Sequence, residues 1–152
     1  MSDCLFCKII AGDIPSNKVY EDDLCYAFND IAPQAPVHFL VIPKAHIASV
    51  AGVNEENSAV VAHIFEVIAK LTKEKGIESY RVVSNIGEQA GQSVPHLHFH
   101  VLAGRDMTWP PGCLFSRSGS EIGSAAALHV VPAPCGSALK GDTLFLKREY
   151  PP

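Results

Sequence analysis

Three histidines separated by single apolar residues constrain this chain more than any other part of its sequence. Residues 96–102 read HLHFHVL, with His96, His98 and His100 at alternate positions. Side chains alternate between the two faces of a β-strand, so a strand here would present the three imidazoles on one face and apolar anchors on the other. We therefore expect a strand over residues 97–102 whose histidines face a cleft.

The residue type and the spacing of these histidines favour an active site over plain packing. An imidazole can act as a nucleophile, carry a proton or ligate a metal near neutral pH. A polar loop ending in Gly91, Gln92 and Ser93 precedes the three histidines. A nucleophilic histidine must present one nitrogen without a proton. We expect its other nitrogen to donate to a backbone carbonyl, which fixes the tautomer.

The remaining pattern predicts an α+β domain. Apolar spacing indicates a short helix around Phe6 and Ile9, capped by Asp3, and a long helix that Asn54 caps and Gly76 ends. Further strands are expected at residues 37–42, at residues 80–84 and, as a pair around a turn, within residues 19–29. The order and the short connections predict a mainly antiparallel five-stranded sheet with one short and one long helix.

Composition excludes several classes of protein. The 152 residues suffice for one domain, and no apolar run approaches the length of a membrane span. The net charge of −4, without a basic cluster, argues against a nucleic-acid polymer as partner, although a small nucleotide needs only a pocket. Five cysteines without an export signal favour reduced thiols or a metal site over disulfides. We expect a cytoplasmic protein that binds no membrane.

The last forty residues differ in character from the rest. Residues 113–152 are rich in Ser, Gly, Ala and Pro. We therefore divide the chain into a domain at residues 1–112 and a C-terminal extension at residues 113–152. The extension is interpreted as a peripheral segment, an oligomerisation arm or an added tail.

The alternating histidine pattern resembles the signature of the histidine-triad (HIT) superfamily, and further segments resemble its Hint branch. These segments are CLFCKII (4–10), FNDI (28–31), APVHFLVIPK (35–44), GQS (91–93) and WPPG (109–112). Members of that branch are purine nucleoside phosphoramidate hydrolases. The resemblance implies a HIT-like fold and a homodimer in which two five-stranded sheets join into one.

The resemblance also implies roles for the residues around the phosphate. His98 would attack the α-phosphorus and form a nucleotidyl-imidazole intermediate that water resolves. His100 and His38 would line the phosphate site, where either supplies positive charge or relays a proton. Ser93 would donate to the phosphate and help the leaving amine accept a proton. Three further residues complete this site: Asn85 and, through their backbone, Gly91 and Gln92.

For the nucleoside, the resemblance implies a carboxylate and four apolar side chains. Asp30 would accept hydrogen bonds from both ribose hydroxyls, with a plain turn residue as the alternative. The apolar side chains would enclose the base, with core packing as their alternative. They are Phe6, Ile9, Phe28 and Ile31.

A second cluster has the chemistry of a metal site. Cys4 and Cys7 have the spacing of a zinc knuckle, but one such pair supplies only two of four tetrahedral ligands. His46 and His96 are candidates for the others, and the resemblance supports this set. The zinc would be structural because four protein ligands leave no open position. It would also remove His96 from phosphate chemistry. Redox chemistry of the CxxC pair is a weaker alternative, and no organic cofactor is expected.

These expectations combine into one leading function and two alternatives. The leading function is cleavage of the P–N bond in adenosine or other purine nucleoside 5′-phosphoramidates, with release of AMP. The segments GQS and WPPG favour it over cleavage of dinucleoside polyphosphates. The second alternative is an AMP-binding interaction module, which would need the pocket but not His98.

Overall fold

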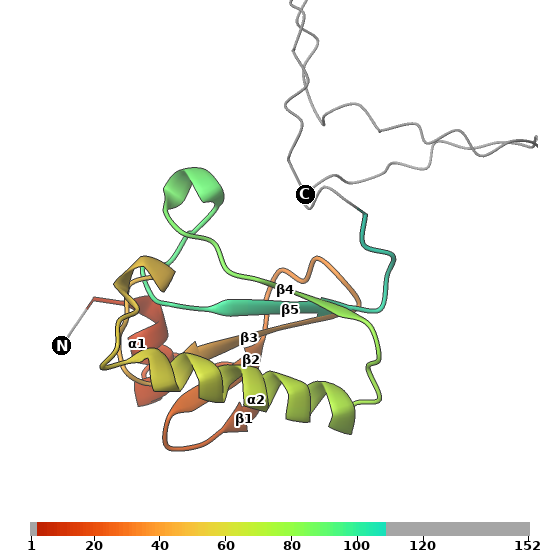
Figure 1. Cartoon of the computed structure of the whole chain (residues 1–152), viewed down its shortest axis with the longest axis horizontal. Helices are drawn as coiled ribbons and strands as arrows, with labels where there is room; N and C mark the ends of the chain where they lie inside the picture. The colour runs from red at the N-terminus through yellow and green to blue at the C-terminus, as the bar shows by residue number, and fades with distance from the viewer. Residues whose placement is uncertain (1–2, 109–152) are drawn as a thin grey trace, which may run out of the picture. The chain divides into compact units, whose positions relative to one another are not determined.

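The predicted segments form five strands and two α-helices in the computed structural model, which describes residues 3–108. The strands are β1 (Lys18–Glu21), β2 (Cys25–Asn29), β3 (Val37–Pro43), β4 (Tyr80–Val83) and β5 (Phe99–Ala103). The α-helices are α1 (Leu5–Ala11) and α2 (Ser58–Glu74). Two short 3-10 helices are η1 (Val50–Gly52) and η2 (Glu88–Ala90). All neighbouring strands are antiparallel in the order β1-β2-β3-β5-β4 (Figure 1). The expected α+β architecture is confirmed.

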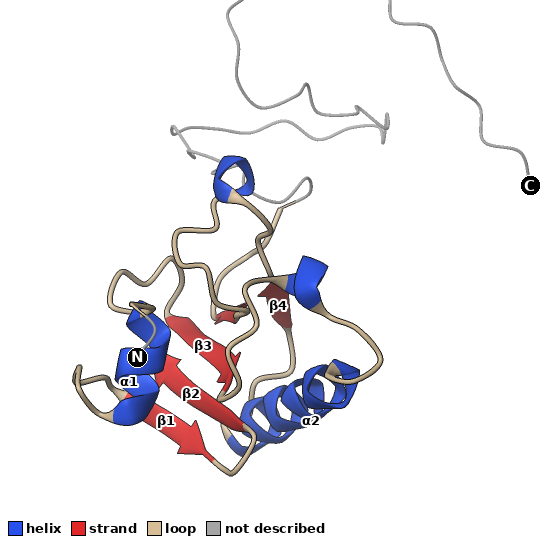
Figure 2. Cartoon of the chain, turned by 90° about the vertical axis from the view of Figure 1, so that its left-hand side faces the viewer, coloured by secondary structure: helices blue, strands red, loops and turns tan. Residues whose placement is uncertain are grey.

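The two α-helices cover opposite faces of the sheet (Figure 2). Ile64 and Ile68 of α2 pack in one core cluster, together with Phe39 of β3. Phe6 and Ile9 of α1 pack in a second cluster on the other face. Strand residues of this second cluster are Tyr26, Phe28, Leu40 and Ile42. Because α1 has seven residues and α2 has 17, the face under α1 is the less completely covered one.

The histidines lie on the face that α1 covers. His100 of β5 pairs with Leu40 of β3, and directly paired residues of an antiparallel sheet point to the same face. His38 occupies an even position of β3, as Leu40 does, and shares that face. The short helix thus leaves room for polar side chains beside the core that it builds.

The strand expected over residues 97–102 starts later than predicted. Strand β5 begins at Phe99, so only His100 of the three histidines lies within it. Before Phe99 the chain leaves the sheet ladder, because the Leu97 amide donates to the Ile47 carbonyl instead of to a neighbouring strand. The histidines therefore occupy a bend and an extended segment as well as a strand.

Both helix caps expected from the sequence are wrong, whereas the helix stop is confirmed. The N-cap of α1 is Cys4, and Asp3 forms an exposed ion pair with a lysine of that helix. The N-cap of α2 is Asn57, and the helix begins at Ser58. Asn54 instead holds the turn before α2, where its side chain accepts the Glu56 amide at 2.9 Å and its carbonyl accepts the Ser58 amide at 2.8 Å. Gly76 follows the end of α2 at a φ of 66°, a conformation that glycine adopts without strain.

Part of the sequence prediction lies outside the described residues. The WPPG segment, the boundary at residue 112 and the extension at residues 113–152 all do, so the division into two parts stays a prediction. Within the described range, no helix combines the length and the apolar character that crossing a membrane requires.

One carboxylate joins helix α2 to the turn between β1 and β2. Oδ1 of Asp22 accepts the amides of Leu24 and Cys25 at 2.9 and 2.8 Å. Its Oδ2 accepts the Tyr20 hydroxyl at 3.0 Å and Nε2 of His63, on α2, at 2.7 Å. Burial by itself would raise the pKa of Asp22, but these hydrogen bonds hold it well below its ordinary value. The ionised carboxylate therefore stabilises the fold.

Replacing Asp22 by Asn should lower the free energy of unfolding at pH 7 by about 2 kcal/mol, because charge-assisted bonds to a partly buried acceptor are lost. The pKa of Asp22 is lower in the folded state than in the unfolded chain, where it is about 3.9. The ionised carboxylate therefore stabilises the fold at pH values above about 3.9, and this stabilisation disappears as the pH falls further. Asp22→Asn should therefore lose less stability than wild type between pH 5 and pH 3, as urea unfolding measures. Asp23→Asn, an exposed neighbour, serves as the control. Equal losses in both variants would contradict this role.

Candidate active site

The hydrogen bonding of His98 selects one tautomer of its neutral ring. Its side chain is almost fully buried, with 3% of its surface exposed, and Nδ1 lies 2.6 Å from the carbonyl oxygen of His96. A carbonyl can only accept, so Nδ1 carries a proton, and in the neutral ring Nε2 keeps its lone pair. Among the described residues no fully buried side-chain nitrogen lacks a partner, so the unpaired Nε2 reaches the surface. The hydrogen bond from Nδ1 to a backbone carbonyl that we expect of a nucleophilic histidine is present at His98, and its role as the nucleophile stays a prediction.

Two contacts that the sequence did not reveal hold His98 in place. The Ser84 hydroxyl, just after β4, donates to the His98 carbonyl at 2.9 Å. The Phe6 ring of α1 meets the His98 ring edge-on, with centroids 5.4 Å apart. Both the backbone and the ring of His98 are therefore fixed by neighbouring elements.

His38 and His100 form a hydrogen-bonded pair across β3 and β5. The Gln34 amide donates to Nδ1 of His38 at 3.1 Å, so this nitrogen accepts and Nε2 carries the proton. Nε2 of His38 then donates to Nδ1 of His100 at 2.9 Å. In the neutral His100 ring the proton is left on Nε2. The pair therefore presents an N–H donor from His100, and the rings of His98 and His100 lie 5.0 Å apart.

Electrostatics keeps this pair uncharged near neutral pH. Burial lowers the pKa of His38, against the opposing influence of the Asp30 carboxylate. Burial also lowers the pKa of His100 to about 4, and the neighbouring His98 and His38 lower it further while Asp30 opposes them. Of the two predicted roles, fixed positive charge is disfavoured, and neutral rings fit hydrogen-bond donation and proton transfer.

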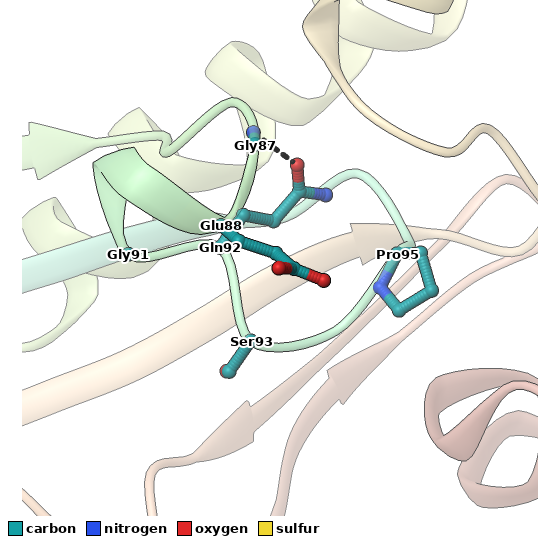
Figure 3. Close-up of a pocket in the computed structure, with 6 residues that line it drawn as sticks. All are labelled: Gly87, Glu88, Gly91, Gln92, Ser93 and Pro95. Atoms are coloured by element: carbon teal, nitrogen blue, oxygen red, sulfur yellow. Dashed lines mark hydrogen bonds between the residues drawn. The ribbon is translucent and has the colours of Figure 1, made fainter.

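The loop before the histidines encloses an open hollow of about 490 Å³ (Figure 3). We call it the Ser93 hollow, and its lining residues are Gly87, Glu88, Gly91, Gln92, Ser93 and Pro95. The Gln92 side chain maintains the loop, because it accepts the Gly87 amide at 2.9 Å and donates to the Ala48 carbonyl at 2.7 Å. Three of the lining residues, Gly91, Gln92 and Ser93, are those for which the family resemblance implies contacts with the phosphate.

Two of the predicted phosphate donors are already bonded inside this loop. The amides of Gly91 and Gln92 donate to the carbonyls of Glu88 and Gly87 at 2.9 and 3.1 Å. Ser93 is exposed, and neither its amide nor its hydroxyl has a hydrogen-bond partner among the described residues. In this structure the donor that the loop offers to a ligand is Ser93.

Three of the four apolar residues expected around the base belong to the core. Phe6, Ile9 and Phe28 are 6%, 9% and 5% exposed and pack between α1 and the sheet. This arrangement agrees with the packing alternative, although Phe6 also borders His98. Ile31 is fully exposed and offers its whole surface to a ligand.

The two remaining polar candidates have partial local roles. Oδ1 of Asp30 accepts the Ala32 amide at 2.8 Å, as a turn residue would, while Oδ2 lies 3.5 Å from Nε2 of His38. Nδ2 of Asn85 donates weakly to the Gly91 carbonyl at 3.4 Å. Asp30 is thus connected to the histidine pair, and Asn85 borders the loop that forms the hollow.

The four predicted metal ligands come together at the start of α1. Nδ1 of His96 lies 3.4 Å from Sγ of Cys4 and 3.6 Å from Sγ of Cys7, and Nδ1 of His46 lies 3.3 Å from Sγ of Cys7. The ligand atoms all lie within 4.8 Å of one another. Zinc bond lengths in a tetrahedral site imply sulfur–nitrogen separations of about 3.6 Å, so the spacing fits.

The protonation of His96 also suits a metal ligand. Its Nε2 lies 2.9 Å from the carbonyl of Pro43 and must donate to it, which leaves the lone pair of Nδ1 facing the thiols. A metal bound here would have four protein ligands and no position for substrate. The residues therefore fit a structural ion that joins α1 to the chain leading into β5.

Comparison with known proteins identifies the family. Residues 3–109 match the family described as scavenger mRNA decapping enzyme C-term binding. An uncharacterised HIT-like protein of Synechococcus elongatus is 50% identical over 111 residues, which are 72% of this chain and 97% of that protein. The chain belongs to the HIT family. A second HIT-like protein, from Synechocystis, is 45% identical over the same length.

Solved HIT structures share the fold. A HIT family hydrolase from Legionella pneumophila is 49% identical with a TM-score of 0.71, and the match covers 72% of this chain and all of the other. A histidine triad protein from Clostridium difficile is 49% identical with a TM-score of 0.68, over 71% of this chain and 96% of the other. These likenesses support hydrolase as the general class of activity of this HIT protein.

The metal cluster predicts the zinc content of the protein. Wild type, purified and equilibrated with zinc, should hold one ion per chain, and Cys7→Ser should hold much less because a thiolate ligand is lost. Elemental analysis after dialysis measures both. Cys25→Ala removes a buried thiol outside the cluster and should keep the ion. Loss of zinc from Cys25→Ala but not from Cys7→Ser would contradict the assignment.

The environment of His100 predicts its titration. Because its pKa is lowered to about 4, the ring should stay neutral down to about pH 5 and gain a proton only below that. NMR of the imidazole carbon-bound protons follows this step, and the missing signal in His100→Gln assigns it. A midpoint near 6.5 would contradict the burial that we describe.

Proposed function

We propose that this HIT protein hydrolyses the P–N bond of purine nucleoside 5′-phosphoramidates through a nucleotidyl intermediate on His98. The observation that carries the proposal is the 2.6 Å bond from Nδ1 of His98 to the His96 carbonyl. It leaves Nε2 with a lone pair in a ring that cannot rotate away. A nucleophile prepared in this way splits one difficult displacement into two easier ones.

In the first step Nε2 of His98 attacks the α-phosphorus, and the bond from phosphorus to the leaving amine breaks. The electron pair of that bond stays on the amine nitrogen, which takes a proton through the exposed Ser93 hydroxyl from water. The imidazole becomes a cation that still donates from Nδ1 to the His96 carbonyl. The N–H of His100 donates to a phosphoryl oxygen, and a donor already in place costs no reorganisation.

In the second step water attacks the phosphorus and the bond from phosphorus to Nε2 breaks. The electron pair returns to His98, and AMP leaves when the nucleoside is adenosine. The proton that water gives up balances the proton that the amine took. His98 ends in its starting tautomer.

Substrate binding and assembly complete the proposal. Asp30 would hold the ribose hydroxyls, and Ile31, with the edges of Phe6, Ile9 and Phe28, would contact the base. Asn85 would hold a polar atom near the phosphate. A homodimer would form through β4, which lies at one edge of the sheet with β5 as its neighbour. Zinc at the cysteine and histidine cluster would be structural and would take no part in either step.

Replacing His98 by Ala should reduce AMP release from an adenosine phosphoramidate by about a thousandfold or more, because the covalent route is lost. Chromatographic detection of AMP measures this rate. Circular dichroism confirms that the variant folds, and AMP binding by calorimetry shows whether its pocket is intact.

His63→Ala serves as the control, since His63 lies on α2, away from the phosphate site, and bonds to Asp22. It should retain turnover. An AMP-binding module would bind AMP without turnover in wild type. That result, or equal turnover by His98→Ala, would contradict the proposal.

A further inference from the structure

The Ser93 hollow holds one charged group. Of its six lining residues only Glu88 bears a charge, and Figure 3 shows its carboxylate extending into the hollow near Ser93 and Pro95. Glu88 has no ion pair and no side-chain hydrogen bond among the residues that the structure describes. The volume of about 490 Å³ lies within the range of small-molecule pockets.

The lining does not suit a nucleobase. It contains no aromatic ring, and its apolar side chain is that of Pro95, so it provides no platform on which a base could stack. The side-chain amide group of Gln92 already accepts a hydrogen bond from the Gly87 backbone amide and donates one to the Ala48 carbonyl. The polar side chains that remain for a ligand are one hydroxyl, on Ser93, and one carboxylate, on Glu88.

The hollow also does not suit a further phosphate. Its lining includes no lysine, arginine or histidine, and the two loop amides of Gly91 and Gln92 already have acceptors. A second phosphate placed here would meet the Glu88 carboxylate without a compensating cation, and like charges in contact disfavour binding.

We propose that the Ser93 hollow receives the leaving amine, and that Glu88 selects phosphoramidates whose amine part carries a second, positively charged group. This inference rests on the proposed function and names its substrate class: conjugates of diamines or basic amino acids. Ser93 lines the hollow, and in the proposed mechanism its hydroxyl passes a proton to the leaving amine, so it connects the hollow to the reacting atoms. The cation extends from the breaking P–N bond into the hollow toward the carboxylate.

Two matched substrates test this selection. Adenosine 5′-phosphoramidates of 1,4-diaminobutane and of pentylamine have nearly the same shape and differ in one ammonium group. Wild type should favour the diamine conjugate by about fivefold in kcat/KM, as expected for a partly exposed ion pair. Added salt should reduce this preference because it screens exposed charges.

Glu88→Gln keeps the size of the side chain and removes its charge. This variant should hydrolyse the diamine conjugate more slowly than wild type and the pentylamine conjugate at the same rate, so that the ratio of the two kcat/KM values comes close to one. Glu55→Gln, an exposed substitution at the turn before α2, should keep the wild-type ratio. A diadenosine polyphosphate should be a poorer substrate than either conjugate, and Glu88→Gln should cleave it faster than wild type.

The outcomes separate this inference from the function on which it rests. If wild type cleaves both conjugates equally, or Glu88→Gln keeps the wild-type ratio, the selection by Glu88 is wrong and the phosphoramidase proposal stands. If wild type cleaves neither conjugate, both proposals are overturned.

Discussion

The bond from the His98 ring to the His96 carbonyl sets the chemistry of this site, and several other contacts serve to hold its two ends. Ser84 bonds to the His98 carbonyl, and Phe6 packs against the ring. His96 in turn is held by the Pro43 carbonyl and faces the thiols of the cysteine pair. The orientation of one imidazole therefore depends on the end of β3, on the segment after β4 and on α1. A backbone acceptor suits this task because it changes neither charge nor tautomer with pH.

The fold explains how a buried sheet can carry a reactive face. Helix α2 covers one face along 17 residues, whereas α1 covers part of the other with seven. On that second face β3 and β5 bring Nε2 of His38 within 2.9 Å of Nδ1 of His100, although the two residues lie 62 positions apart in the sequence. Burial there lowers the pKa of both histidines, so the surroundings that stabilise the sheet also keep these rings neutral.

Much of the fold could be predicted because apolar periodicity and turn residues are local signals. The same holds for the residue types of the site, and for the tautomer of His98, which follows from what a nucleophile requires. The start of β5 at Phe99 could not be predicted, because it depends on Ile47 accepting the Leu97 amide. Nor could the role of Ser84, since the register that places it beside His98 is a tertiary property. No sequence motif includes Glu88, and its place in the Ser93 hollow follows only from the conformation of the loop.

The arrangement of Gln92 has a consequence for how such a protein can diversify. Its side chain holds the loop to Gly87 on one side and to Ala48 on the other, so the loop keeps its shape independently of the side chains at η2. Substitutions at Glu88 and its neighbours can alter the rim while leaving the bond that orients His98 untouched. Under the proposed function, selection among leaving groups can then evolve in one short segment, while the residues proposed to break and form bonds to phosphorus stay constant.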